Sequence, residues 1–245
     1  MRVAALYDVH GNLPALEAVL AEVEALGVEA VVVGGDIAVG PMPRGALDRL
    51  LALGERARFL RGNGDREIAE PSAGADLWLE RTRWSAEQLE PGQRAWLAAL
   101  PDTQSLEVDG LGPVLFCHGS PRSDEEILTR ISPGERVAAA VEGVTEGVVV
   151  CGHTHVQFDR QVAGKRLLNA GSVGMPYEAE PGAYWALLGP DVELRRTDYD
   201  LDAAAEAVRA TGFPGADELA AENVLTVPSA DEATEQFEAM AQAEG

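Results

Sequence analysis

The 245-residue sequence predicts an α/β fold in which a parallel β-sheet is covered by helices on both faces. The main observation is that short apolar runs ending at a polar residue alternate with segments whose apolar residues recur at helical spacing. Glycine and proline mark the boundaries between these segments. The composition is also that of a globular protein, with 46% hydrophobic residues and interspersed charges.

The first part of the chain repeats a strand–helix unit. Residues 2–7 (RVAALY) form a short apolar run, as expected of a buried strand. The helix that follows begins near Pro14 and ends at Gly27, because proline suits a first helical turn and glycine a helix end. A second run covers 29–36, and after another helical segment a third run covers 57–65. Strands joined through helices in this way predict parallel pairing.

The rest of the chain changes this rhythm. Residues 70–100 are helical in character and contain three of the four tryptophans, which predicts an inserted cap. Further strands are expected at 105–110, 113–120 and 147–155. A helix around 137–141 separates the last two, and 156–199 alternates in β fashion. From about Leu201 the chain is rich in alanine and glutamate. We therefore expect one domain over 1–245, with a helical cap at about 70–100 and an acidic helical extension at about 201–245.

Charge and composition exclude several classes of protein. The net charge is −22 and the isoelectric point is about 4.4, so the surface is expected to repel duplex nucleic acid and anionic membranes. Two cysteines provide no disulfide framework in a chain of this length. No apolar run approaches the roughly 20 residues that a membrane span needs. The apolar start is too short for a signal peptide, and a cytoplasmic location is expected.

Polar residues with metal-ligand chemistry follow the predicted strands. They are Asp8, His10, Asp36, Asn63, His118, His153 and His155. All four histidines of the chain belong to this set, and ligands of α/β proteins gather beyond the carboxyl ends of strands. Imidazole, carboxylate and amide donors suit manganese, iron or zinc. Because seven donors exceed the needs of one tetrahedral ion, the sequence predicts two metal ions.

Five short motifs in a fixed order carry a family resemblance. They are DVHGN (8–12), GGD (34–36), GNGD (62–65), CHGS (117–120) and GHTH (152–155). Together they resemble the signature of calcineurin-like metallophosphoesterases, especially small bacterial members related to diadenosine tetraphosphatase and Ser/Thr phosphatases. The resemblance extends from residue 1 to about 199. It implies a four-layer α/β/β/α sandwich of two mixed sheets with a dinuclear metal site between them.

The resemblance also implies a role for each ligand. The first metal is expected on Asp8, His10 and His155. The second is expected on Asn63, His118 and His153, with Asp36 bridging both. Manganese is the first expectation for the metal, and iron, zinc, nickel and cobalt are the alternatives. Our hypothesis is an in-line attack on phosphorus by a hydroxide that bridges the metals, with no covalent phosphoenzyme and with Asp36, Asn63 and His118 as catalytic residues.

Gly64 departs from the family pattern. The superfamily commonly has a histidine here, which is thought to assist the leaving group, and this chain has no further histidine to replace it. A positioned general acid is typically worth about 10²–10⁴-fold in rate. We therefore expect activity to be higher on good leaving groups than on alkyl esters. Asp65 loses its usual histidine partner, and we expect it to cap the following turn or to pair with Arg66.

Other positions near the motifs have weaker signals. Asn12 and Arg66 are candidates for phosphate binding, although a structural or solvated role explains each of them equally well. Asn169 and Ser172 lie in a glycine-containing loop that either supports the site or simply turns the chain. For the tryptophans of 70–100 we expect packing within the cap in preference to stacking on a nucleobase.

The function predicted from the sequence is a metal-dependent phosphohydrolase acting on phosphodiesters or nucleotides, hence on phosphorylated small molecules. The alternatives are a Ser/Thr-type protein phosphatase and a weakly active or non-catalytic protein-interaction scaffold on the same fold. A nuclease would share the metal chemistry, but the acidic charge and the absence of a basic stripe disfavour it.

Overall fold

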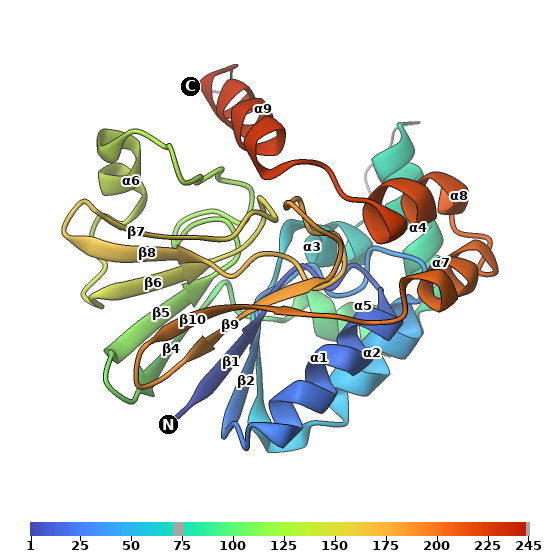
Figure 1. The fold of residues 1–245 in the computed structure, drawn as a ribbon, viewed down its shortest axis with the longest axis horizontal. Helices are drawn as coiled ribbons and strands as arrows, with labels where there is room; N and C mark the ends of the chain where they lie inside the picture. The colour runs from blue at the N-terminus through green and yellow to red at the C-terminus, as the bar shows by residue number, and fades with distance from the viewer. Residues whose placement is uncertain (71–75, 244–245) are drawn as a thin grey trace.

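Two five-stranded β-sheets form the centre of the molecule (Figure 1). The computed structural model describes residues 1–70 and 76–243. The first sheet has the order β10 (Val192–Thr197), β9 (Ala183–Leu188), β1 (Val3–Leu6), β2 (Ala30–Val33) and β3 (Ala57–Phe59). Strands β1, β2 and β3 pair in parallel, whereas β9 pairs antiparallel with both β1 and β10. The sheet is therefore mixed.

The second sheet is also mixed. Its order is β4 (Thr103–Val108), β5 (Gly112–Cys117), β6 (Val148–Cys151), β8 (Lys165–Asn169) and β7 (Phe158–Val162). The inner three strands pair in parallel, and β4 and β7 are antiparallel edges.

Strand β1 shows why the two sheets stack. Successive side chains of a strand point to opposite faces, and in β1 both faces are apolar and buried. Val3 and Ala5, together with Tyr7 just beyond the strand, pack into the core between the two sheets. Ala4 and Leu6 pack into a second core, beneath the helices.

Helices cover the outer face of each sheet. Those associated with the first sheet are α1 (Leu13–Ala25), α2 (Pro43–Leu51), a 3₁₀ turn (Gly54–Arg56), α3 (Asn63–Ala69), α4 (Leu77–Gln88) and α5 (Pro91–Ala98). Helix α6 (Gly134–Ala140) packs on the outer face of the second sheet. The layers are thus helix, sheet, sheet and helix, which confirms the predicted four-layer sandwich.

The strand–helix rhythm alone gave a wrong prediction about coverage. The helices of residues 1–70 and 76–243 that pack on a sheet cover one face of it, and the other face packs against the partner sheet. A fully apolar strand shows that both faces are buried, but its pattern does not reveal whether a helix or a sheet covers each face.

The segment predicted as a cap contains α4 and α5, while residues 71–75 lie outside the described residues. The C-terminal extension contains α7 (Leu201–Arg209), α8 (Ala216–Leu219), a π-helical turn (Ala220–Leu225) and α9 (Ala230–Ala243). Helices α7 and α8 form a separate small apolar cluster with Trp84 of α4. In Figure 1, α9 (red) extends from that side across the upper end of the sandwich toward α6.

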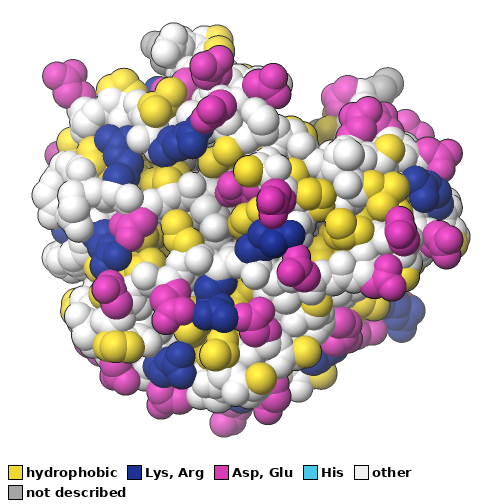
Figure 2. Space-filling view, in the orientation of Figure 1, with side chains coloured by type: hydrophobic (Ala, Val, Ile, Leu, Met, Phe, Trp, Pro, Cys, Tyr) yellow, Lys and Arg dark blue, Asp and Glu magenta, His cyan; other side chains and the backbone are white. Residues whose placement is uncertain are grey.

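On the face seen in Figure 2, acidic side chains are spread widely and basic side chains are dispersed among them. No helix in the described part of the chain is both long and apolar enough to cross a membrane.

Candidate metal centre

The seven candidate ligands converge at one end of the sandwich, beyond the carboxyl ends of β1, β2, β5 and β6 and at the start of α3. Six of the non-glycine residues described have a positive φ angle, and five of them are candidate ligands. These five are Asp8 (52°), His10 (44°), Asp36 (50°), His153 (66°) and His155 (58°). Left-handed backbone is unfavourable for L-residues and concentrates at functional sites. The packed sheets therefore hold these loops in conformations that aim polar side chains at a common centre.

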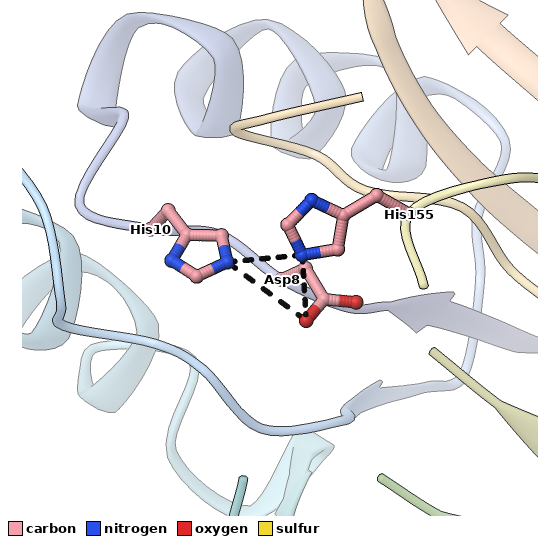
Figure 3. Close-up of side chains that lie close together, drawn as sticks. All are labelled: Asp8, His10 and His155. Carbon is pink, nitrogen blue, oxygen red and sulfur yellow. Dashed lines mark hydrogen bonds and ion pairs between the residues drawn. The ribbon is translucent and has the colours of Figure 1, made fainter. Parts of the chain in front are cut away.

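Asp8, His10 and His155 form the first ligand group (Figure 3). The Nε2 atoms of the two histidines are 3.1 Å apart, and Asp8 Oδ1 lies 3.4 Å from Nε2 of His155 and 4.0 Å from Nε2 of His10. On its other side, each ring places Nδ1 against a backbone carbonyl, at 3.0 Å from Val39 for His10 and 2.7 Å from Met175 for His155.

These carbonyls determine what the first group can bind. A carbonyl only accepts hydrogen bonds, so each Nδ1 carries the proton and each Nε2 presents a lone pair. Two such lone pairs 3.1 Å apart repel each other. A cation bound by both nitrogens removes that repulsion, so the donor set fits a metal ion.

The second group consists of Asp8, Asp36 and His118, with Asn63 beside it. His118 Nε2 lies 3.6 Å from Asp36 Oδ1, 3.8 Å from Asp8 Oδ1 and 3.2 Å from Asn63 Oδ1. Its Nδ1 faces the carbonyl of Gly34 at 2.8 Å, so Nε2 is again the free donor atom.

His153 is placed differently from the other histidines. Its ring lies 5.2 Å from that of His118, centroid to centroid, and its backbone N–H donates to Asp8 Oδ2 at 2.9 Å. Burial is the largest cause that lowers its pKa to about 4, which keeps the ring neutral and able to bind a metal.

Both carboxylates reach both groups. Asp8 Oδ1 belongs to each group, and Asp36 lies 3.8 Å from His10 Nε2 through one oxygen and 3.6 Å from His118 Nε2 through the other. The placement of Asp36 is compatible with the bridging role expected of it, and that role stays a prediction.

Asp8 supplies a direct test of whether a cation fits. Its Oδ1 atom is buried and has no hydrogen-bond partner among the described residues. Burial alone would raise the pKa of Asp8, but positive charge at the neighbouring His155 and His118 outweighs it and holds the pKa well below its usual range. Where these rings are neutral metal donors, a bound cation has to supply that positive charge. A buried, ionised and unpartnered oxygen is costly unless a positive charge neutralises it. The residues therefore fit divalent metal ions.

Gly64 and Asp65 explain the turn after Asn63. The N–H of Gly64 donates to Asp36 Oδ1 at 2.7 Å, and a Cβ at this position would lie 2.9 Å from Val39 Cγ2 and 3.0 Å from Asp36 Oδ1. A larger residue here would thus press on the Asp36 carboxylate. Asp65 accepts from the N–H groups of Gly62 (3.1 Å) and Ile37 (3.0 Å), so it caps the turn and does not pair with Arg66. Burial and the charge of Asp36 raise its pKa to about 7.

The polar groups of the two predicted substrate-binding residues are engaged elsewhere. The side chain of Asn12 is buried, accepts from Ala15 N–H at 3.2 Å and donates to the carbonyl of Gly174 at 3.1 Å. Arg66 pairs with Asp124 (2.8 Å) and Glu125 (2.7 Å), and it lines a different cavity from the metal centre. Their roles in substrate binding stay predictions.

Asn169 and Ser172 support the ligand loops. Asn169 Nδ2 donates to the carbonyl of Gly152 at 2.6 Å, next to His153. Ser172 Oγ donates to the carbonyl of Asp8 at 2.8 Å and accepts from the N–H of Met175, whose own carbonyl holds His155. Both side chains are fully buried.

A cavity of about 380 Å³ opens onto the ligands, and sequence reasoning missed much of its wall. Besides five of the ligands, it is lined by Trp78, Arg81, Met175, Tyr177, Phe237 and Met240. Trp78 therefore lies at the metal centre as well as packing on the core, while Trp84 and Trp96 pack against Phe213 and Phe59. No sequence signal linked Phe237 to a site more than 80 residues earlier in the chain.

Comparison with known proteins shows what the chain and its fold are similar to. The chain is 24% identical over 240 residues to an uncharacterised protein of Methanocaldococcus jannaschii. The alignment covers 86% of this chain and 93% of that protein. The structure resembles a hypothetical protein of Pyrococcus horikoshii (TM-score 0.79, 22% identity, 92% of this chain and 99% of that chain). It also resembles a metallophosphoesterase of Sphaerobacter thermophilus, with a TM-score of 0.72 and 26% sequence identity. The match covers 90% of this chain and 98% of that chain.

Residues 1–189 match the calcineurin-like phosphoesterase superfamily domain. This match covers most of the chain and includes all seven candidate ligands. The protein belongs to the calcineurin-like phosphoesterase superfamily, and it is a metal-dependent phosphoester hydrolase.

Proposed function

We propose that this protein hydrolyses phosphodiesters or nucleotides at a pair of divalent cations. The observation that carries the proposal is the convergence of three histidine Nε2 atoms on the buried, unpartnered Oδ1 of Asp8, at 3.4, 3.8 and 4.0 Å. When bound, such ions polarise a phosphoryl oxygen and lower the pKa of water toward neutrality.

The residues divide into two sets around the shared carboxylates. Asp8, His10 and His155 would hold one cation, Asn63, His118 and His153 would hold the other, and Asp36 is within reach of both sets. Manganese is our first choice of metal, since the donors are imidazoles with hard oxygens and include no thiolate.

The charge balance favours an anionic substrate. Two divalent cations contribute +4, and the carboxylates of Asp8 and Asp36 contribute −2, so the centre keeps a net positive charge inside a chain of net charge −22. The centre therefore attracts phosphate locally although the protein as a whole repels anions.

The surroundings of Gly64 favour substrates with good leaving groups. Glycine carries no group that can protonate a departing alkoxide, and the backbone here is in contact with Asp36. Nitrophenyl esters, phosphoanhydrides and activated diesters need less protonation of the leaving group than alkyl esters do, and we infer that they are the better substrates.

A screen of metal-reconstituted protein tests the proposal. The panel contains phosphomonoesters, linear and cyclic diesters and dinucleoside polyphosphates, with metal content measured in parallel and Asp36→Asn as the matched variant. We expect turnover of bis(p-nitrophenyl) phosphate by the wild type and its loss in Asp36→Asn. Protein that binds no metal and hydrolyses no ester of the panel would contradict the proposal and favour a scaffold role. An Asp36→Asn variant as active as the wild type would instead contradict the bridging role of Asp36.

A further inference from the structure

A continuous arc of aromatic rings surrounds the metal centre. Trp78 contacts His10 at a centroid distance of 6.3 Å, and His10 contacts His155 at 4.9 Å. Tyr177 lies 4.8 Å from His155 and 6.2 Å from Phe237. Phe237 in turn lies 6.5 Å from His153. Much of the cavity beside the candidate ligands is therefore lined by aromatic surfaces.

The three outer rings, which we call the aromatic wall, are Trp78, Tyr177 and Phe237. They come from α4, the loop after β8 and α9, and the Trp78 indole N–H donates to Glu67. The backbone N–H of Tyr177 donates to the carbonyl of His155 at 3.1 Å, which ties this ring to a metal ligand.

Helix α9 is held in place by a buried carboxylate next to Phe237. Glu238 accepts from Thr129 and Ser132 at 2.5 and 2.6 Å, and from Arg136 of α6 at 2.5 Å. Asp231, at the start of α9, also pairs with Arg130. These contacts fix the position of Phe237 over the cavity, although α9 lies apart from α7 and α8 (Figure 1).

Arg81 adds a positive charge to the same wall. It lies one helical turn after Trp78, so both side chains share a face of α4. Its Nε donates to the carbonyl of Pro214 at 3.1 Å, and its guanidinium lies 5.5 Å from the Phe213 ring centroid. Within the described residues, Arg81 is the only lysine or arginine lining this cavity and has no carboxylate oxygen within 4.0 Å.

We propose that the aromatic wall and Arg81 form the binding pocket for the organic group of the substrate, and that this group is a planar aromatic ring. The inference rests on the proposed phosphohydrolase function and narrows its substrate class to small aromatic phosphoesters, such as aryl phosphates or nucleotides. Ring faces favour stacking with a flat partner. A guanidinium that has no carboxylate partner among the described residues favours the anionic oxygens of a bound phosphoester. A cavity of about 380 Å³ has the size of a small-molecule pocket.

Binding of phosphonates tests this pocket independently of catalysis. A phosphonate has a carbon–phosphorus bond that phosphoester hydrolysis does not cleave, so affinity is measured by calorimetry on the full chain loaded with manganese. The probes are phenylphosphonate, cyclohexylphosphonate and methylphosphonate, which share an anionic group and differ in their organic part. We expect phenylphosphonate to bind about tenfold more tightly than methylphosphonate, and more tightly than cyclohexylphosphonate.

Two variants separate the parts of the pocket. Phe237→Ala should reduce the phenyl-to-methyl affinity ratio at least about fivefold, since it removes a stacking surface. Arg81→Met should weaken all three phosphonates by a similar factor, because it removes a charge and not a ring. The matched controls are Leu51→Ala, an exposed apolar residue at the end of α2, and Arg94→Met, an arginine lining a different cavity. Neither control should change the affinities or the ratio.

The outcomes distinguish this inference from the proposed function. Equal affinities of the wild type for phenyl- and methylphosphonate, or an unchanged ratio in Phe237→Ala, would overturn the aromatic pocket even in an active hydrolase. Ring-dependent binding in a protein that hydrolyses no ester of the screen would support the pocket and overturn the function.

Discussion

The cavity at the metal centre has two parts that are built in different ways. We call the candidate metal ligands its floor, and the aromatic wall of Trp78, Tyr177 and Phe237 forms its side. The floor consists of the candidate metal ligands that follow successive strands, and five of them adopt left-handed backbone within loops held by the two sheets. The wall comes from α4, the Tyr177 loop and α9. Two ion pairs, Glu238–Arg136 and Asp231–Arg130, together with two hydroxyls that donate to Glu238, hold α9. The contrast suggests that the floor determines the reaction whereas the wall determines the substrate. Changes to the floor should affect every substrate, and changes to the wall should affect only some.

The largest effect is expected in the floor, from Asp8→Asn. This change removes the carboxylate that belongs to both ligand groups, and loss of one member of a catalytic unit typically costs about 10⁴-fold or more in rate. Hydrolysis of bis(p-nitrophenyl) phosphate and metal content should both fall. Asp109→Asn, an exposed residue paired with the N-terminus, is the control and should behave as wild type. Retention of both metals and full activity by Asp8→Asn would refute the assignment.

The next effect concerns the leaving group. Because no side chain at Gly64 can donate a proton, we expect nitrophenyl phosphoesters to be hydrolysed about 10²–10⁴-fold faster than the corresponding alkyl esters. Steady-state rates on matched pairs of esters measure this ratio. Comparable rates on the two classes would mean that another group protonates the alkoxide.

A smaller effect is expected from Ser172→Ala, which alters a buried residue that supports the loops of the candidate ligands. The hydroxyl donates to the Asp8 carbonyl and accepts from Met175, so its loss loosens the loop that carries a ligand. Removing such supporting hydrogen bonds typically costs about 10–100-fold in metal affinity or activity. Competition with a metal chelator gives the affinity. Ser105→Ala, on the edge strand β4, is the matched control, and an equal loss in both variants would contradict a local role.

The smallest effect is expected in the wall, from Glu238→Gln. The substitution keeps the size of the side chain but weakens its bonds to Arg136 and the two hydroxyls, so α9 should open more often. We expect a few-fold drop in the phenyl-to-methyl affinity ratio and faster amide exchange in α9. Unchanged exchange would show that α9 is held by other contacts.

The Glu238 carboxylate also makes the attachment of α9 depend on pH. Burial opposes ionisation of Glu238, but its bonds to Ser132, Thr129 and Arg136 lower its pKa below the usual value. The contribution of the ionised Glu238 to holding α9 in place is therefore complete above the unfolded-state pKa of about 4.3. It is lost as pH falls through the lower folded-state pKa. The difference in α9 exchange between wild type and Glu238→Gln should be large at neutral pH and vanish in acid. A difference that persists at low pH would contradict the role of this charge.

Most of the floor could be predicted from the sequence, because strand ends are local features and parallel strands bring their ends together. The layer that covers each sheet face could not be predicted from the strand–helix pattern, because an apolar strand such as β1 is equally suited to a helix or another sheet. The family resemblance supplied that information.

The wall was not predictable for a different reason. Trp78, Tyr177 and Phe237 meet only through tertiary packing, and each one alone looks like an ordinary core or surface aromatic. Arg66 shows that closeness to a candidate ligand in sequence does not decide which cavity a side chain lines. It lies three residues from a ligand in sequence, yet it pairs with Asp124 and Glu125, whereas Arg81 lines the cavity from a separate helix.

The left-handed angles at Asp8, His10, Asp36, His153 and His155 have a consequence for protein engineering. Glycine adopts such angles without steric penalty, so replacing one of these residues by glycine would relieve backbone strain and stabilise the fold. The same replacement would remove a candidate metal ligand and with it the activity. A selection for thermal stability alone would thus enrich inactive variants, and a screen that also measures turnover would be needed to retain activity.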